Sequence, residues 1–175
     1  MEKKKLVCFV GKSGSGKTTL VSALELSGYK SVLSMTTREK RFEGETGHVF
    51  VSPTGFHKFD SDMVAYTKFD GHEYGATRQM LNEADLYVID VAGVKELRKR
   101  YHDKDLFVVY IDIKPKVAYR RMRQRGDKPI KAIKRIINDK RMFADIDDIK
   151  PDLVFDAESP FEYKLKVIQS VLRDN

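Results

Sequence analysis

The residues with the clearest chemical potential lie between positions 11 and 18. Gly11 is followed after four residues by Gly16, Lys17 and Thr18, the complete spacing of a phosphate-binding loop, or P-loop. Glycines let backbone N–H groups curl around phosphate oxygens, and the lysine reaches the outer phosphates of a nucleoside triphosphate. The spacing predicts that the triphosphate is bound by Gly11, Ser13, Gly14, Ser15, Gly16, Lys17, Thr18 and Thr19. The Thr18 hydroxyl is the predicted ligand of Mg²⁺.

A buried strand should lead into this loop, and a helix should follow it. Residues 6–10 are continuously apolar, and apolar residues recur at helical spacing after the loop. This context favours phosphate binding over a glycine-rich turn that binds nothing. Further apolar runs at 86–91, 106–113 and 153–155 precede helical patterns at 94–101, 117–122 and 161–172. The alternation predicts an α/β fold of three layers, α/β/α, around a central parallel sheet.

Two segments interrupt the alternation of strands and helices. Residues 34–77 are rich in threonine, glycine, aromatic and charged residues without a long helical period, which favours a strand-rich insertion. A polar loop is expected at 123–130, between two basic helices. We therefore expect one domain, with a core at 1–33 and 81–175, an insertion at about 34–80 and a lid at about 123–135.

The charge of the chain is concentrated in one segment. Its 175 residues carry a net charge of +7, yet 12 basic and only two acidic residues, Asp127 and Asp139, lie between Lys114 and Arg141. The rest of the chain holds 21 basic and 24 acidic residues. Because the surplus of positive charge is confined to this one segment, it indicates an anion bound locally by that segment. We therefore expect no nucleic-acid partner.

The composition excludes several other classes of protein. A single cysteine, Cys8, rules out a disulfide framework or a thiolate zinc cluster. The early apolar run is too short for a membrane span or a signal peptide. We expect a cytoplasmic protein without a membrane partner, either a monomer or a homodimer.

Several motifs after the P-loop resemble, in the same order, those of guanylate kinases. Residues 34–41 match the pattern Ser-x-Thr-Thr-Arg-x-x-Arg, and residues 71–77 are similar to Gly-x-x-Tyr-Gly-Ser/Thr. Residues 90–94 parallel an Asp-x-x-Gly turn, and 121–126 resemble the start of the lid. The resemblance, over about residues 5–141, implies Mg²⁺-dependent transfer of the γ-phosphoryl group of ATP to GMP or dGMP.

The resemblance also implies roles for individual residues. Arg38 and Arg41 match a clamp on the acceptor phosphate, and guanidinium groups meet phosphate oxygens bidentately. The implied acceptor site comprises Ser34, Arg38, Arg41, His48, Tyr74, Gly75 and Asp90. Arg121 is expected to contact ATP, and the implied catalytic residues are Lys17, Arg38, Arg125 and Arg135. The alternatives are a solvated basic surface for the arginines, core packing for Tyr74 and a helix cap for Asp90.

Four positions depart from the guanylate kinase pattern. Ala65 stands where a glutamate reads guanine, and Ala76 where a serine or threonine follows Tyr-Gly. His48 replaces a tyrosine and Val88 an aspartate, while Glu73 or Asp70 could restore the carboxylate in another register. Two alternatives therefore stay open: a kinase of this fold acting on another nucleotide or phosphorylated small molecule, and a non-catalytic guanylate-kinase-like binding module.

Overall fold

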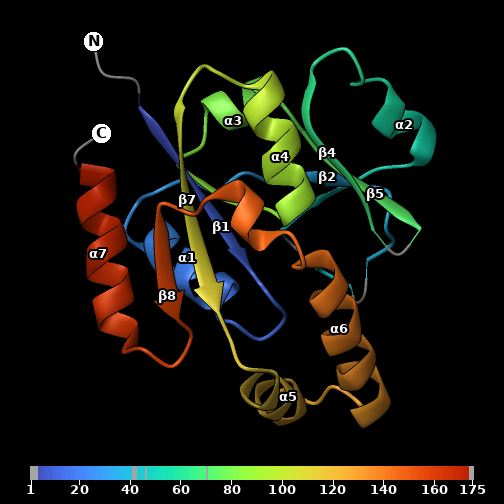
Figure 1. The fold of residues 1–175 in the computed structure, drawn as a ribbon. Helices are drawn as coiled ribbons and strands as arrows, with labels where there is room; N and C mark the ends of the chain where they lie inside the picture. The colour runs from blue at the N-terminus through green and yellow to red at the C-terminus, as the bar shows by residue number, and fades with distance from the viewer. Residues whose placement is uncertain (1–3, 41–42, 46, 70, 174–175) are drawn as a thin grey trace.

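A central parallel sheet carries the loop at residues 11–18. The computed structural model describes residues 4–40, 43–45, 47–69 and 71–173. Its main sheet has the order β6-β1-β7-β8, with all neighbouring strands parallel (Figure 1). The strands are β1 (Lys5–Gly11), β6 (Leu86–Val88), β7 (Asp105–Asp112) and β8 (Leu153–Asp156). Because β1 lies between β6 and β7, its carboxyl end places Gly11 near the centre of the sheet, at the carboxyl ends of the strands.

Helices cover both faces of this sheet, which confirms the expected three layers. Alternate residues of β1 enter different cores, because successive strand side chains point to opposite faces. Leu6 and Cys8 pack in one core with α4 (Val91–Arg100), whereas Val7 and Phe9 pack in the other. The second core includes side chains of α1 (Lys17–Leu26), α5 (Pro115–Gln124) and α7 (Phe161–Arg173).

Two boundaries differ from their predicted places. The strand predicted to reach residue 91 ends at Val88, and α4 begins at Val91. This prediction was wrong because Asp90 caps α4, its Oδ1 accepting the Gly93 N–H at 2.6 Å. The loop predicted at 123–130 is shorter, because α5 extends to Gln124 and proline starts α6 (Pro129–Met142).

The insertion is a second sheet of four strands, as its composition indicates. The strands are β2 (Met35–Thr36), β3 (Val49–Phe50), β4 (Met63–Phe69) and β5 (His72–Thr77), in the order β3-β2-β5-β4. Met35, Phe56 and Met63 form its small core, with Phe56 supplied by α2 (Pro53–His57). Short α3 (Arg78–Asn82) leads back to β6, and the 3₁₀ turn η1 (Ile146–Ile149) precedes β8.

A candidate nucleotide-binding site

One cavity of about 1170 Å³ extends from the P-loop to the insertion sheet. The end of the cavity at the P-loop, which we call the donor end, is lined by every residue predicted to bind the triphosphate. These residues are Gly11, Ser13, Gly14, Ser15, Gly16, Lys17, Thr18, Thr19 and Arg121. Its other end is lined by Ser34, Arg38, His48, Tyr74 and Asp90 from the predicted acceptor set. The cavity thus brings together residues from distant parts of the chain.

The P-loop glycines are required by close contacts and by backbone conformation. A Cβ atom on Gly11 would lie 2.7 Å from Ser15 Oγ and 2.8 Å from the Ile111 carbonyl oxygen. Gly14 and Gly16 have φ angles of 77° and 97°, which L side chains rarely adopt. α1 begins directly after this turn, so its positive end faces the cavity.

Lys17 is held inside the turn by oxygen atoms of the loop itself. Its ammonium donates to the carbonyl oxygens of Gly11 and Lys12, the latter at 3.1 Å, and to Ser15 Oγ at 3.3 Å. Burial lowers the pKa of Lys17 to about 8, with Arg135 and Arg125 adding to the decrease and Asp139 opposing it.

At the acceptor end, Arg38 is fixed by an acidic neighbour. Its two terminal nitrogens donate to the two carboxylate oxygens of Glu45, at 2.8 and 3.2 Å, and this contact raises the pKa of Arg38. The pairing holds the guanidinium at the cavity wall. Arg41, the second expected clamp residue, lies outside the described residues.

His48 and Asp90 both line the cavity and also contact other residues of the protein. His48 Nδ1 lies 2.9 Å from Ser34 Oγ, and its ring packs edge-on against Tyr74. Asp90 caps α4, as the alternative interpretation of this residue expects, and it also lines the cavity.

Gly75 does not line the cavity, although the resemblance implies that it contacts the acceptor. A Cβ atom at this position would lie 2.5 Å from Met63 Sδ and 2.9 Å from Phe56 Cζ. The insertion core therefore explains why position 75 is glycine.

The wall expected to read the base carries no carboxylate among the β4 and β5 side chains that line it. Ala65, Thr67 and His72 line it, and Ala65 pairs with Ala76 across the two strands. Guanine presents two hydrogen-bond donors on one edge, and the glutamate expected to accept them is absent from position 65.

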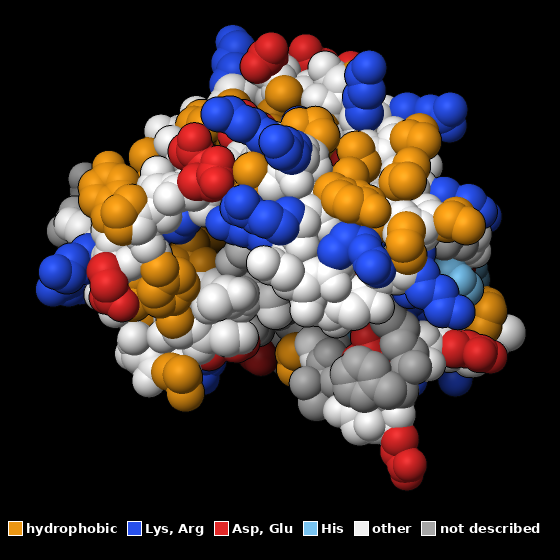
Figure 2. Space-filling view, turned by 90° about the horizontal axis from the view of Figure 1, so that it is seen from below, with side chains coloured by type: hydrophobic (Ala, Val, Ile, Leu, Met, Phe, Trp, Pro, Cys, Tyr) orange, Lys and Arg blue, Asp and Glu red, His pale blue; other side chains and the backbone are white. Residues whose placement is uncertain are grey.

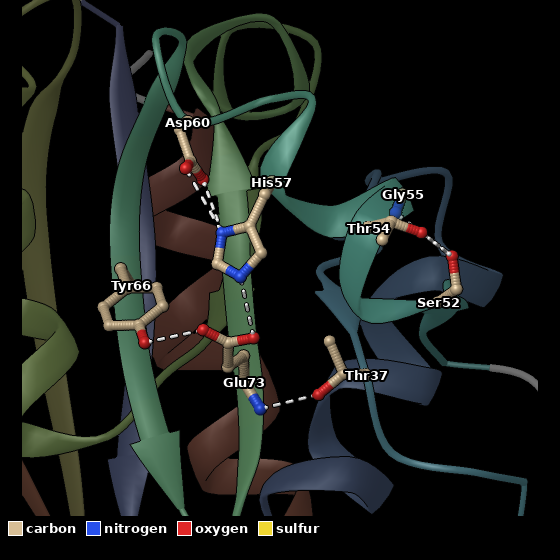
Figure 3. Close-up of polar contacts among 8 residues, drawn as sticks. All are labelled: Thr37, Ser52, Thr54, Gly55, His57, Asp60, Tyr66 and Glu73. Carbon is tan, nitrogen blue, oxygen red and sulfur yellow. Dashed lines mark hydrogen bonds and ion pairs between the residues drawn. The ribbon is translucent and has the colours of Figure 1, made fainter.

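Glu73, considered as a substitute for that glutamate, does not line the cavity, and its carboxylate contacts Tyr66 and His57 instead (Figure 3). Tyr66 Oη donates to Glu73 Oε1 at 2.9 Å, and His57 Nε2 lies 3.4 Å from Glu73 Oε2. The Glu73 N–H donates to Thr37 Oγ1 at 2.9 Å. Asp70, the other substitute considered, lies outside the described residues.

The three predicted lid-side arginines all line the cavity, in different settings. Arg121 donates to the carbonyl oxygens of Gly14 and Ala157, at 3.1 and 3.0 Å. Arg125 contacts Asp127 at 2.7 Å. Arg135 lies 3.6 Å from the same carboxylate, and its Nε donates to Ser13 Oγ at 3.2 Å.

Sequence reasoning gave no role to two carboxylates that contact this machinery. Asp127 joins Arg125 to Arg135, and Asp139 Oδ2 accepts the Ser13 N–H at 2.7 Å. Hydrogen bonds donated by Arg125 lower the pKa of the Asp127 carboxyl. A signal was available, since they are the two acidic residues of the basic segment from Lys114 to Arg141.

The basic side chains do not merge into one broad patch on the face beneath α5 and α6. Figure 2 shows Lys and Arg separated there by hydrophobic and uncharged side chains. Within the described ranges, no group of three or more His, Cys, Asp and Glu side chains is placed to hold a metal ion. No helix among the described residues is both long and apolar enough to cross a membrane.

Two curated relatives share part of their sequence with this chain. The guanylate kinase of Aster yellows witches'-broom phytoplasma (strain AYWB) is 28% identical over 145 residues, which is 75% of this chain and 69% of that protein. The guanylate kinase of Onion yellows phytoplasma (strain OY-M) is 28% identical over 134 residues, 69% of this chain and 63% of that protein. The matches thus span about two thirds of each relative's length.

Solved structures show the same fold. The guanylate kinase from Anaplasma phagocytophilum superposes with a TM-score of 0.69 at 17% identity, covering 99% of this chain and 87% of that one. A gluconokinase from Sinorhizobium meliloti 1021 superposes with a TM-score of 0.56 at 14% identity, covering 99% and 94% of the two chains.

A family profile matches most of the sequence. The profile described as AAA domain aligns with residues 7–142, a range that includes the whole P-loop and both carboxylates of the basic segment. The sequence matches and the shared fold confirm the resemblance that the motifs indicated. The chain belongs to the AAA domain family and is related to guanylate kinases.

Proposed function

We propose that this protein is a nucleoside monophosphate kinase that transfers the γ-phosphoryl group of ATP to the phosphate of GMP or dGMP. The observation that carries the proposal is the continuous cavity, which joins a complete P-loop to the Arg38 region of the insertion sheet. Phosphoryl transfer mainly requires two polyanions held in line with their charge neutralised. The names of the two curated relatives support the same reaction.

At the donor end, backbone N–H groups of the P-loop and the Lys17 ammonium bind the phosphates of ATP. Thr18 is exposed and lines the cavity, so its hydroxyl is accessible to Mg²⁺. Mg²⁺ commonly keeps several waters and binds substrate phosphates through few protein ligands, which suits this set of side chains. When bound there, the ion would neutralise charge on the outer phosphates of ATP.

At the acceptor end, Arg38 binds the phosphate of the monophosphate, with Arg41 and Tyr74 as further contacts. Glu45 fixes the orientation of Arg38 beforehand, which reduces the ordering cost on binding. Arg125 and Arg135 stabilise the charge of the transferring group, and Arg121 holds the P-loop beside the loop at Ala157. We further propose that residues at about 123–135 act as a lid that excludes water.

A second candidate is a kinase of this fold that acts on another nucleotide or on a phosphorylated small molecule. The wall formed by Ala65, Thr67 and His72 favours it, because this wall offers no carboxylate to guanine, and a buried donor left without an acceptor costs about 1–3 kcal/mol. By contrast, the complete P-loop argues against a non-catalytic binding module.

The proposal is tested by measuring ADP release from Mg·ATP with a panel of nucleoside monophosphates and their deoxy forms. We expect turnover that depends on GMP or dGMP. Turnover with a different acceptor would support the second candidate and assign the altered specificity to the Ala65 wall. A protein that binds ATP but turns over with no member of the panel would contradict nucleoside monophosphate kinase activity.

A further inference from the structure

Ser13, the third residue of the P-loop motif, is contacted by α6 at its backbone N–H and at its hydroxyl. Its N–H donates to Asp139 Oδ2 at 2.7 Å, and its hydroxyl oxygen accepts from Arg135 Nε at 3.2 Å. Arg135 and Asp139 are four residues apart in the helix, so their side chains lie on one face, one turn apart. We name these three residues the Ser13 clamp.

We propose that Asp139 is a positioning residue for phosphoryl transfer, which holds α6 against the P-loop so that Arg135 keeps a fixed place beside the phosphates. This inference rests on the proposed function. Asp139 acts through Ser13 and Arg135 and need not touch the substrate. Without its carboxylate, the clamp loses the 2.7 Å hydrogen bond from the Ser13 N–H and keeps the 3.2 Å contact from Arg135 to Ser13.

The setting of Asp139 explains why the position is acidic in an otherwise basic helix. The residues of α6 that line the cavity are Lys131, Lys134, Arg135, Asn138, Asp139 and Met142. Three of these six are cationic, and Asp139 is the single acidic residue in the sequence of α6. A hydrogen bond from an amide N–H to a carboxylate is about twice as strong as one to a neutral acceptor, so Asp139 is suited to hold Ser13.

Asp127 supports the other side of Arg135. Its carboxylate lies 3.6 Å from Arg135 Nη1 and 2.7 Å from Arg125 Nη2, so the two arginines share one anchor. The clamp fixes this pair relative to the P-loop, whereas Asp127 fixes the arginines relative to each other. The contact between Asp139 and Ser13 therefore sets the distance between Arg135 and the P-loop. This is the distance that matters for a phosphoryl group transferred from a nucleotide bound at the P-loop.

A competing role for Asp139 makes the opposite prediction. If its carboxylate competed with a phosphate oxygen for the Ser13 N–H, removing it would tighten ATP binding and leave turnover unchanged. If it positions Arg135, removing it lowers kcat and changes the KM for ATP much less. The two roles are separated by steady-state kinetics alone.

The experiment compares Asp139→Ala, Asp139→Asn and Arg135→Ala, singly and as the Asp139→Ala/Arg135→Ala double variant. The control, Asp148→Asn, removes an exposed carboxylate outside the cavity that pairs with Lys95. We expect Asp139→Ala to lower kcat about tenfold or more, since a misplacement of about 1 Å can cost about 10²-fold. Asp139→Asn should restore part of the loss, because its amide oxygen still accepts a hydrogen bond.

In the Arg135→Ala background, Asp139→Ala should have little further effect on kcat. Equal fold-losses in both backgrounds would overturn the proposal, because Asp139 would then not act through Arg135. A lower KM for ATP with unchanged kcat would also overturn it.

Hydrogen exchange at the Ser13 amide gives a readout that does not depend on turnover. We expect faster exchange at Ser13 in Asp139→Ala than in the wild type or in Asp148→Asn. If the wild type transfers phosphate to no acceptor, the proposed function fails. The Ser13 clamp is then tested by hydrogen exchange at the Ser13 amide alone. Unchanged exchange at Ser13 in Asp139→Ala would overturn the clamp itself.

Discussion

At the scale of single residues, Lys17 carries a charge that burial makes costly. Its pKa is lowered to about 8, so the free protein loses this charge as the pH rises through that value. We expect kcat/KM for ATP to fall above about pH 8, because neutral lysine no longer attracts the phosphates. At saturating ATP the decline in kcat should begin at higher pH, since bound phosphates favour the protonated form. A kcat/KM for ATP that stays constant up to pH 10 would contradict this role.

Arg38 gives a second residue-scale prediction, at the other end of the cavity. We expect Arg38→Ala to raise the KM for the acceptor and lower kcat, while the KM for ATP changes little. The matched control is Arg78→Ala, which removes an arginine from an ion pair with Asp103 outside the cavity. Initial rates with each nucleotide varied in turn provide the measurement. Acceptor kinetics equal to those of the control would rule out a role for Arg38 in binding the acceptor phosphate.

Ala65 allows the base preference to be tested directly. We expect Ala65→Glu to increase the ratio of kcat/KM for GMP over AMP about tenfold or more, because the new carboxylate accepts from the guanine edge. The control is Thr67→Glu, which places the same group two residues along the same wall. A gain in both variants would indicate a general charge effect, and a gain in neither would mean that other residues read the base.

At the scale of elements, the turn between α5 and α6 depends on Asp127. Arg125 lowers the pKa of this carboxyl, so Asp127 contributes stability above its unfolded value of 3.8 that is lost as the pH falls through the lower folded value. We expect Asp127→Asn to lower the free energy of unfolding at pH 7, and the difference from the wild type to disappear in acid. Urea titrations at several pH values provide the measurement, and a difference that does not shrink as the pH falls below 3.8 would contradict the ion-pair explanation.

Elements governed by local patterns could be predicted from the sequence, and contacts between them could not. The strand, P-loop and helix at the amino-terminal end follow from apolar periodicity and glycine spacing, which act over a few residues. Asp90 shows the limit, since a capping side chain moved the start of α4 to Val91. The contact of Asp139 with Ser13 spans 126 positions in the chain, so no local pattern reveals it. Likewise, only the pairing of β4 with β5 shows that Glu73 accepts a hydrogen bond from Tyr66 and does not itself line the cavity.

At the scale of the whole molecule, the cavity has two ends supplied by different parts of the fold. The donor end comes from β1, α1 and the basic segment, and the acceptor end comes largely from the insertion sheet. A ligand that binds only the folded state stabilises it by about 2.7 kcal/mol at 100 times its Kd. For a chain of this size, that corresponds to a rise in Tm of about 5–10 °C.

The two ends should therefore respond independently in thermal unfolding. We expect Mg·ADP to raise the Tm of the wild type and of Arg38→Ala but not of Lys17→Ala. GMP should raise the Tm of the wild type and of Lys17→Ala but not of Arg38→Ala, because the two side chains serve different phosphates. Loss of both shifts in either variant, with its unliganded Tm unchanged, would mean that the cavity binds one ligand across its length rather than two nucleotides at its ends.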